Sequence, residues 1–335
     1  MSLQRTVSVS ITMLVGLGFG AAAFAQTGAD VTNSKHNLSV SGPGPVTTAD
    51  ENQVCVFCHT PHGATISPGA PLWNRQLSTQ TYTTYTSSSL DAETIAGQLQ
   101  QPAGSSKLCL SCHDGSMAIG AVNVSGGQQN VTFNMAGTGA GGEMPAGDGT
   151  QTGYTRNLGV DLTNDHPISL TFDTTLAIAD GELRDPATSD EIGLRSPGVR
   201  PLFPLEPTGP ANEAQLQCAS CHDPHLPDAG GEPRKFLRGN RLQLNDPVGA
   251  FDAANDIVCL GCHDKEGWVG SVHASSVTAN ETYTAGAAAQ REFPANTPVW
   301  QASCLNCHDS HTVHGARRLL RDGCLLYTSP SPRDI

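Results

Sequence analysis

The pattern Cys-x-x-Cys-His occurs five times in this chain, and it is the pattern by which haem c is attached covalently to proteins. The two cysteines form thioethers to the porphyrin, and the histidine directly after them binds the iron. Every CxxC in the sequence is followed by this histidine, which a chance pattern would not give. We therefore expect five haem c groups, one at each of motifs 1 to 5, which are residues 55–59 (CVFCH), 109–113 (CLSCH), 218–222 (CASCH), 259–263 (CLGCH) and 304–308 (CLNCH).

Other uses of paired cysteines explain the pattern less well. A zinc ribbon combines two CxxC pairs in one tetrahedral site, but its chemistry does not require a histidine after every second cysteine. Disulfide frameworks do not usually space every pair by two residues. A thioredoxin-like CxxC occurs once, beside a βαβ pattern that this sequence lacks. The expected thioether cysteines are Cys55, Cys58, Cys109, Cys112, Cys218, Cys221, Cys259, Cys262, Cys304 and Cys307.

The second axial ligand of each iron decides its chemistry, because two strong ligands make an electron carrier and an open position makes an enzyme. The expected first ligands are His59, His113, His222, His263 and His308. Three of the six expected second ligands come three residues after a motif histidine, and the other three lie one in each long segment without a motif. They are His62, His225 and His311, and His36, His166 and His273.

Six second ligands for five irons leave a surplus, which a further haem or a neighbouring subunit would take. His314 is a further candidate ligand, whereas Met117 is too close in sequence to His113 to reach the far side of the same haem. Bis-histidine ligation at every iron is the favoured interpretation, and it implies low reduction potentials.

The motifs alternate between two forms, which indicates an internal repeat. Motifs 1, 3 and 5 read CxxCHxxH, whereas motifs 2 and 4 read CxxCHD. A basic-apolar run comes after motif 3 as residues 234–238 (RKFLR) and recurs after motif 5 as residues 317–321 (RRLLR). The alternation predicts a sixth motif after the fifth. Residues 324–335 instead resemble a translated sequencing adaptor, so we expect a natural chain that continues past Gly323 and carries a sixth haem; a genuine tail with a free thiol at Cys324 is the alternative.

The first 25 residues have the features of a secretory signal peptide, with Arg5, an apolar stretch and an Ala23-Phe24-Ala25 cleavage site. An uncleaved membrane anchor is the alternative interpretation. No later stretch is apolar enough to cross a membrane, so we expect a periplasmic or extracellular protein without a membrane span after cleavage. The formal net charge of −13 argues against nucleic acid as a partner and would attract a basic docking surface.

The elements that must position these residues are only weakly indicated. Aromatic residues make up 5% of the chain, with 36 Gly and 22 Pro, so an ordinary protein core is not expected. We expect a multihaem cytochrome c fold: mostly loops, short α-helices at the CxxCH motifs, few short strands and a core built around stacked haems. The expected regions are 26–155 with two haems and 156–323 with three haems.

Local patterns predict a few elements within this frame. Asp114, Asp223, Asp264 and Asp309 come directly after motif histidines and are candidates to cap short helices, with solvated turns as the alternative. Residues 90–100 are expected to form an amphipathic helix, residues 126–153 a glycine-rich linker, and residues 159–172 a few short strands.

The CHTPHGA and CHDPH forms of the motif, together with the NDHPIS segment, resemble the doubled-CxxCH family of multihaem c-type cytochromes. The resemblance covers most of residues 34–323. It implies bis-histidine low-spin haems stacked in a chain, electron transfer in anaerobic or extracellular respiration, and a periplasmic or cell-surface location. Some members form extracellular filaments in which a histidine of one subunit binds a haem of the next, and His36 is the candidate donor here.

We therefore expect an electron carrier rather than an enzyme, with other redox proteins as donor and acceptor. A multihaem reductase of a small nitrogen or sulfur oxyanion, with one open haem site, is one alternative. A subunit of an extracellular cytochrome filament, which would assemble with copies of itself, is another.

Overall fold

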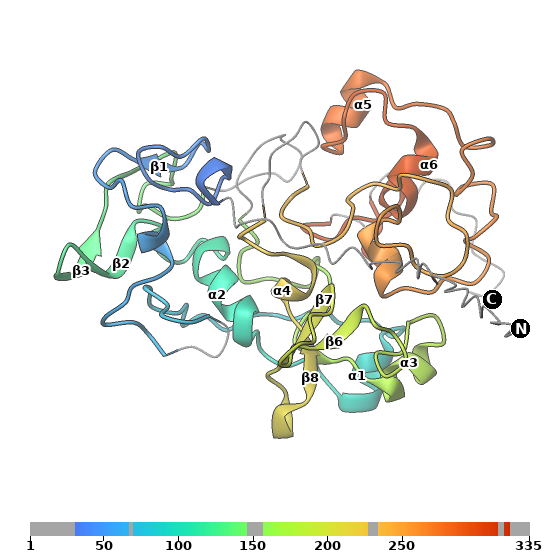
Figure 1. Cartoon of the computed structure of the whole chain (residues 1–335), viewed down its shortest axis with the longest axis horizontal. Coiled ribbons are helices and arrows are strands. Elements are labelled where there is room, and N and C mark those ends of the chain that lie inside the picture. Colours follow the sequence, from blue (N-terminus) through green and yellow to red (C-terminus); the bar gives the residue numbers. More distant parts are fainter. Residues whose placement is uncertain (1–30, 67–69, 146–156, 227–233, 314–317, 322–335) are drawn as a thin grey trace, which may run out of the picture.

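The computed structural model describes residues 31–66, 70–145, 157–226, 234–313 and 318–321. Most of these residues lie in loops, with short helices and strands between them (Figure 1). The expected signal peptide and the segment 324–335 lie outside the described residues. No helix among the described residues is long and apolar enough to span a membrane.

All five motifs lie on single turns or short stretches of helix. Motif 2 forms the end of α2 (Gly104–His113), and motif 3 contains α4 (Cys218–Cys221). Motifs 1, 4 and 5 contain 3-10 helices, which are Cys55–Phe57, Val258–Gly261 and Ser303–Asn306. The other helices are α1 (Asp91–Ala96), α3 (Thr174–Asp180), α5 (Ala285–Gln290), α6 (Val299–Ala302) and the 3-10 helices Val31–Asn33 and Pro210–Asn212. Short helices thus lie at all five motifs, but the expected α-helix is present only at motifs 2 and 3 and a 3-10 helix stands at motifs 1, 4 and 5.

The helices of motifs 2 and 3 pack at their N-termini through serine hydroxyls. Ser106 Oγ accepts a hydrogen bond from the Cys218 backbone N at 2.9 Å, and Ser105 Oγ accepts one from Ala219 N at 3.1 Å. The free N–H groups of α4 are thereby satisfied by α2. Glu206 in turn accepts from the Ser105 backbone N at 2.9 Å and stabilises the start of α2. Residues more than 100 positions apart in sequence are thus held together.

The strands form three small sheets. β1 (Thr47–Thr48) pairs antiparallel with β4 (Met135–Ala136), and β2 (Ala121–Ser125) pairs antiparallel with β3 (Gln128–Thr132). The four-stranded sheet has the order β5-β8-β7-β6, with β6 parallel to β7 and the other pairs antiparallel. Its strands are β5 (Leu170–Thr171), β6 (Ile192–Leu194), β7 (Phe203–Pro207) and β8 (Ala214–Leu216).

The hairpin of β2 and β3 corrects the expectation of a linker over residues 126–153. Gly126 and Gly127 form its two-residue turn with φ values of +57° and +77°, as a type I′ turn requires. Strands continue to Ala136, so only part of the glycine-rich segment is irregular among the described residues. The glycines are explained by turn geometry rather than by chain flexibility.

Two further local expectations change in the structure. The helix expected at residues 90–100 is limited to α1, because Gly97 takes φ +79° and ends it. The aspartates after the motifs precede no helix among the described residues, so none of them is a helix N-cap, and Asp114 is the C-cap residue of α2. Instead, Asp223, Asp264 and Asp309 each pair with an arginine, and Asp114 binds hydroxyl groups.

The apolar core is divided into several small clusters among the described residues. The largest joins β5 to β8 with α3 and with Ala92 and Leu99, so it contains residues on both sides of position 155. A second packs Phe57 of motif 1 against Val122 of β2, and another packs Leu110 of α2 against Tyr82. In Figure 1, β2 and β3 lie towards one end of the molecule, α5 and α6 towards the other, and α2 and α4 between them. The motifs are thereby distributed along the length of the molecule.

Candidate functional site

Four of the five motif histidines each face a second histidine from elsewhere in the chain. In all four pairs the distance between ring centroids lies in a narrow range of 6.1–6.3 Å. We number the pairs by their motif. Pair 1 is His59 with His225 at 6.2 Å, pair 2 is His113 with His36 at 6.3 Å, pair 3 is His222 with His311 at 6.1 Å, and pair 4 is His263 with His166 at 6.3 Å.

This distance fits one metal ion between two imidazoles. With a metal–nitrogen bond of about 2 Å and a ring nitrogen about 1.1 Å from the ring centre, two imidazoles on opposite sides of one ion have centroids about 6.2 Å apart. The distance alone does not identify a metal site, because His59 and Trp73 also have ring centroids 6.2 Å apart in an edge-on contact. The presence of one CxxCH histidine in each of the four pairs is what points to a metal. The residues present therefore fit axial ligation of a haem iron at motifs 1 to 4.

Hydrogen bonds orient the motif histidines for this role. His59, His222 and His308 each place Nδ1 at 2.8 Å from a backbone carbonyl oxygen, those of Pro71, Lys235 and Arg318 respectively. A carbonyl oxygen only accepts, so Nδ1 carries the proton and donates. Nε2 is then unprotonated and available to a metal ion.

The partner histidines of pairs 1 and 3 donate to carboxylates instead. His225 Nδ1 lies 3.0 Å from Asp223 Oδ1, and His311 Nδ1 lies 3.1 Å from Asp165 Oδ1. His166 of pair 4 has its Nδ1 at 3.0 Å from the Pro167 carbonyl oxygen. The group that accepts a hydrogen bond from the second histidine is thus a carboxylate in pairs 1 and 3 and a backbone carbonyl in pair 4.

Burial favours the neutral form of five histidines of the motifs and pairs, which are His36, His166, His222, His263 and His308. Loss of hydration is the largest cause and lowers the pKa of His36 and of His222 to about 4, and that of His263 to about 3. In each of these three cases the next cause that lowers the pKa is the other histidine of the same pair. Burial also lowers the pKa of His166 and of His308. Neutral imidazole is the form that binds a metal ion.

The pairs are arranged in the order of the motifs. The pKa of His36 in pair 2 is lowered, after burial and His113, by His222 of pair 3 and His225 of pair 1. His311 of pair 3 contributes to the lowered pKa of His166 in pair 4 after burial. His308 likewise contributes to that of His263 after burial and His166. Each site is therefore next to the sites of the neighbouring motifs, and the five form one continuous row.

Cysteine contacts give the same order. The thiols of Cys109 and Cys218 are within hydrogen-bonding reach, as are those of Cys259 and Cys304. These contacts join motif 2 to motif 3 and motif 4 to motif 5. All ten motif cysteines are free thiols in the structure, so none is used in a disulfide.

Two buried donors beside motif 1 lack a partner in the structure. They are Trp73 Nε1 and Arg75 Nε, and Arg75 is only 1% exposed. The Arg75 guanidinium also donates to the backbone carbonyls of Ala118 and Ile119, at 2.8 and 2.5 Å. Haem carries two propionate carboxylates, which are suitable acceptors for such donors.

The described residues contain no group of three or more His, Cys, Asp or Glu side chains that could hold a metal ion.

Four of the six expected second ligands thus face a motif histidine, and the structure gives each its partner. They are His36, His166, His225 and His311. The ring of His36 lies 6.3 Å from that of His113 in the same chain, which favours a ligand within the chain over the expected donor to another subunit. His62 and His273 are exposed and face no motif histidine among the described residues, and His308 faces no second imidazole there. His314 lies outside the described residues.

The sequence interpretation missed two residues at the motifs, Asn74 and Arg184. Both donate hydrogen bonds to motif backbones, at motif 1 and motif 4. The signal for Arg184 is the dipeptide Leu183-Arg184, which repeats Leu237-Arg238 and Leu320-Arg321 from the basic runs. This repeat is difficult to recognise in the sequence, because the dipeptide lies far before motif 4, whereas the basic runs directly follow motifs 3 and 5.

No family model matches this chain, and no curated protein sequence matches it either.

Proposed function

We propose that the chain is a multihaem c-type cytochrome that carries electrons along a row of haems with two histidine ligands each. The observation that carries the proposal is the set of four histidine pairs, all with ring centroids 6.1–6.3 Å apart and each containing one CxxCH histidine. Two cysteines adjoin the motif histidine of every pair and would form the thioethers. When bound, haem supplies one-electron transfer at its iron.

The chain itself contributes ligand binding, orientation and sequential order. Backbone carbonyls hold the Nδ1–H of the motif histidines, and burial keeps the imidazoles neutral. Because the sites adjoin one another in motif order, an electron entering at either end can pass through each site in turn. Redox proteins are the proposed donor and acceptor, in anaerobic or extracellular respiration, for a chain exported to the periplasm or beyond.

Electron paramagnetic resonance of the oxidised, haem-loaded protein tests the proposal. Parallel imidazole planes separate the energies of the iron d orbitals, whereas perpendicular planes leave them nearly equal. The ring planes make angles of 19° and 35° in pairs 1 and 3, and of 86° and 72° in pairs 2 and 4. We expect two low-spin signals of the rhombic type and two with a large maximal g value.

Haem content by the pyridine haemochrome assay gives the second readout, with five haems per chain expected. Protein without covalent haem, or with high-spin iron at motifs 1 to 4, would overturn the proposal. His166→Ala should convert one large-g signal to high-spin, whereas His273→Ala is the matched control and should change none. A high-spin signal at motif 5 alone would favour the reductase as the function of that site.

A filament subunit is the second candidate, and the pairing rule favours it. The second histidine of a CxxCHxxH motif faces the motif histidine two motifs earlier: His225 of motif 3 faces His59, and His311 of motif 5 faces His222. His62 of motif 1 is exposed and has no such partner among the described residues, and neither has His308. With the sixth motif that the alternation predicts, motif 5 of one copy stands two motifs before motif 1 of the following copy. His62 of the following copy would then satisfy the same rule by binding the motif 5 iron of the copy before it.

Sedimentation of the haem-loaded protein distinguishes the two candidates. A filament subunit should sediment as large assemblies that His62→Ala dissolves and that His273→Ala leaves intact. If the protein is a monomer and its motif 5 iron is low-spin, the second ligand of that iron comes from the same chain, and the filament candidate fails.

A further inference from the structure

A four-residue segment packs across motif 3 in a defined hydrogen-bonding pattern. Residues 235–238, which we call brace 3, form a bridge to the motif at His222 and Leu237. Arg238 donates from its backbone N to the Cys221 carbonyl and from Nε to the Ala219 carbonyl, both at 2.8 Å. Its guanidinium pairs with Asp223 at 3.2 Å. The first residue of the brace, Lys235, supplies the carbonyl that accepts from His222 Nδ1.

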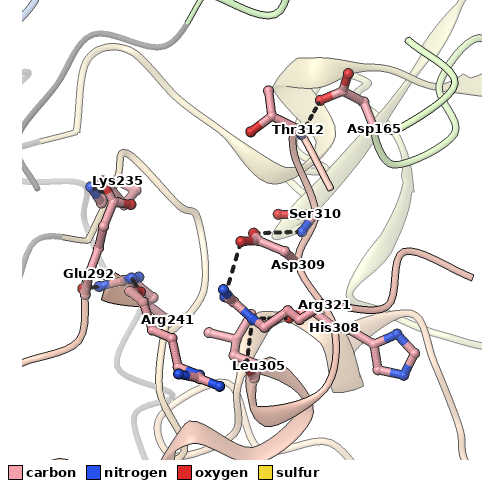
Figure 2. Close-up of polar contacts among 11 residues, drawn as sticks. Asp165, Lys235, Arg241, Glu292, Leu305, His308, Asp309, Ser310, Thr312 and Arg321 are labelled. Carbon is pink, nitrogen blue, oxygen red and sulfur yellow. Dashed lines mark hydrogen bonds and ion pairs between the residues drawn. The ribbon is translucent and has the colours of Figure 1, made fainter. Parts of the chain in front are cut away.

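Motif 5 has the same arrangement. Brace 5, residues 318–321, forms a bridge at His308 and Leu320. Arg321 donates from its backbone N to the Cys307 carbonyl at 2.8 Å and from Nε to the Leu305 carbonyl at 3.0 Å. Figure 2 shows its guanidinium between Leu305 and Asp309, with an ion-pair distance of 3.0 Å to Asp309.

Motif 4 receives its brace from a segment that lies far before it in sequence. Brace 4 is residues 181–184, just after α3. Arg184 donates from its backbone N to the Cys262 carbonyl and from Nε to the Leu260 carbonyl, both at 2.8 Å, and pairs with Asp264 at 3.1 Å. Leu183 forms the bridge to His263. The motif itself therefore sets the pattern, whether the brace lies before or after it in the chain.

Motif 1 uses a neutral version. Brace 1, residues 71–74, ends in Asn74, whose backbone N donates to the Cys58 carbonyl at 2.9 Å and whose Nδ2 donates to the Val56 carbonyl at 2.6 Å. Thr60 stands where the other three braced motifs have aspartate, so both charges are missing together. Motif 2 instead places Asp114 against hydroxyls of Ser78 and Tyr82.

The braces contain residues in an uncommon backbone conformation. Positive φ occurs at both first positions of braces 3 and 5, with Lys235 and Phe236 at 54° and 58° and Arg318 and Leu319 at 52° and 55°, and at the second position of brace 1, with Leu72 at 56°. Side chains other than glycine rarely adopt this conformation, and it persists where surrounding contacts impose it. In brace 4 glycine occupies the first position, Gly181 at 72°. The conformation directs the first carbonyl of braces 3 and 5 at the imidazole.

We propose that Arg184, Arg238 and Arg321, with Asn74 as their neutral counterpart, are positioning residues that fix the ring orientation of the motif histidines by anchoring these braces. The inference rests on the proposed function, since the rings are taken to be iron ligands. Nε of each arginine and its backbone N hold the two ends of the CxxC turn. The brace is thereby fixed in register. In braces 1, 3 and 5 its first carbonyl oxygen then lies 2.8 Å from the imidazole Nδ1, and in brace 4 the contact with the histidine is the bridge between Leu183 and His263.

Stabilisation by the ion pair does not account for Arg184, because Asp264 is 60% exposed at its side chain and such exposed ion pairs contribute little to folding. The pairs at motifs 3 and 5 are more buried, so there the ion pair adds to the bonds described above. The repeated features are the two bonds to motif carbonyls, which asparagine reproduces without charge. These bonds hold the brace in a fixed position against the motif and so fix the orientation of the histidine ring. The orientation of the ring affects the electronic structure of a bound iron.

Arg184→Gln in the haem-loaded chain tests the proposal at motif 4. We expect five haems to remain attached, since the thioethers do not involve Arg184. One of the two large-g signals should broaden or move towards the rhombic type, because loss of the Arg184 bonds loosens the Leu183 bridge that holds His263 with its ring at 72° to His166. Arg184→Lys should give the same change, since lysine has no Nε–H in the arginine position. Asp264→Asn should leave the signal in place.

Arg200→Gln is the matched control, because Arg200 is exposed and donates only to the Ser196 carbonyl. Five haems with a wild-type spectrum in Arg184→Gln would overturn the brace proposal and leave the proposed function intact. Absence of haem from the wild-type chain would instead overturn the proposed function. Should Arg184→Gln lose haem, Arg321→Gln repeats the test at motif 5, and haem loss from both variants would assign the braces a folding role and overturn the proposal.

Discussion

At the scale of single residues, the acceptors of the imidazole Nδ1–H distinguish the sites. The motif histidines His59, His222 and His308 donate to backbone carbonyls. His225 and His311 donate instead to Asp223 and Asp165. A carboxylate acceptor gives the imidazole more anionic character than a carbonyl does, and a more electron-rich ligand favours ferric iron. The sites at motifs 1 and 3 should therefore have lower reduction potentials than the site at motif 4.

Asp165→Asn tests this difference at motif 3. Asp165 is 4% exposed, and its carboxylate also accepts from the Thr312 backbone N at 3.1 Å. The variant removes the negative charge but keeps an oxygen acceptor, so we expect one of the redox transitions to move to higher potential and the others to stay. A spectroelectrochemical titration measures this. Asp161→Asn, in the same loop and exposed, is the control, and an unchanged titration of Asp165→Asn would contradict the assignment.

At the scale of elements, the motif helices are held by contacts that their own sequences do not contain. Short helices at the CxxCH motifs could be predicted because the pattern is local. His62, His225 and His311 could be singled out by their spacing, but not the partner of each, because the ring that His225 faces lies two motifs away across loops. Arg184 could not be placed, since nothing in its neighbourhood indicates the motif that it contacts.

The contact between motif 4 and β7 gives a stability prediction. A Cβ added at Gly261 would lie 2.1 Å from Cε2 of Phe203, which is 1% exposed. Gly261→Ala should therefore destabilise the protein by about 1–3 kcal/mol, measured by thermal unfolding of the haem-loaded chain. Gly286→Ala in α5 is the control, because its Cβ would meet nothing within 4 Å and alanine favours helix. Equal unfolding temperatures for the two variants would contradict this packing role.

Asp114, at the C-terminal end of α2, gives a prediction about pH. Loss of hydration raises the pKa of this carboxyl, but hydrogen bonds from Ser78, Tyr82 and Ser116 outweigh it and hold the pKa below its ordinary value of 3.8. A lowered folded-state pKa contributes stability above the ordinary value, and this is lost as the pH falls through the folded-state pKa. Asp114→Asn should lower the free energy of unfolding at neutral pH. In acid, the free energies of unfolding of the variant and the wild type should lie closer together. Urea unfolding at pH 7 and pH 3 measures both, and a constant difference would refute the assignment.

At the scale of the whole molecule, the described residues have small separate apolar clusters and a row of histidine pairs between them. The protein core on its own is therefore modest, and ligand binding should be coupled to folding. The low aromatic content predicted this, whereas the order of the sites in space depends on contacts such as Ser105 with Ala219 that no local pattern indicates.

Haem removal gives the corresponding prediction. A variant with all ten motif cysteines replaced by alanine cannot form thioethers, and we expect it to be largely unfolded. Far-ultraviolet circular dichroism and the dispersion of amide proton resonances measure this against the haem-loaded chain. A haem-free chain with native-like spectra would show that the polypeptide alone determines the fold.

For a chain that is exported from its N-terminus, the pairing also determines the order in which the two histidines of each site emerge. His36 and His166 precede motifs 2 and 4, so both ligands of these sites have already emerged when the motif does. His59 and His222 must wait until the chain has been delivered as far as His225 and His311, two motifs later. In the proposed cytochrome, sites 1 and 3 would therefore pass through an interval with one ligand position empty, exposed to competing small molecules and to premature reaction. Sites 2 and 4 would be complete as soon as their motif emerges, whereas sites 1 and 3 would depend on export of the later motifs.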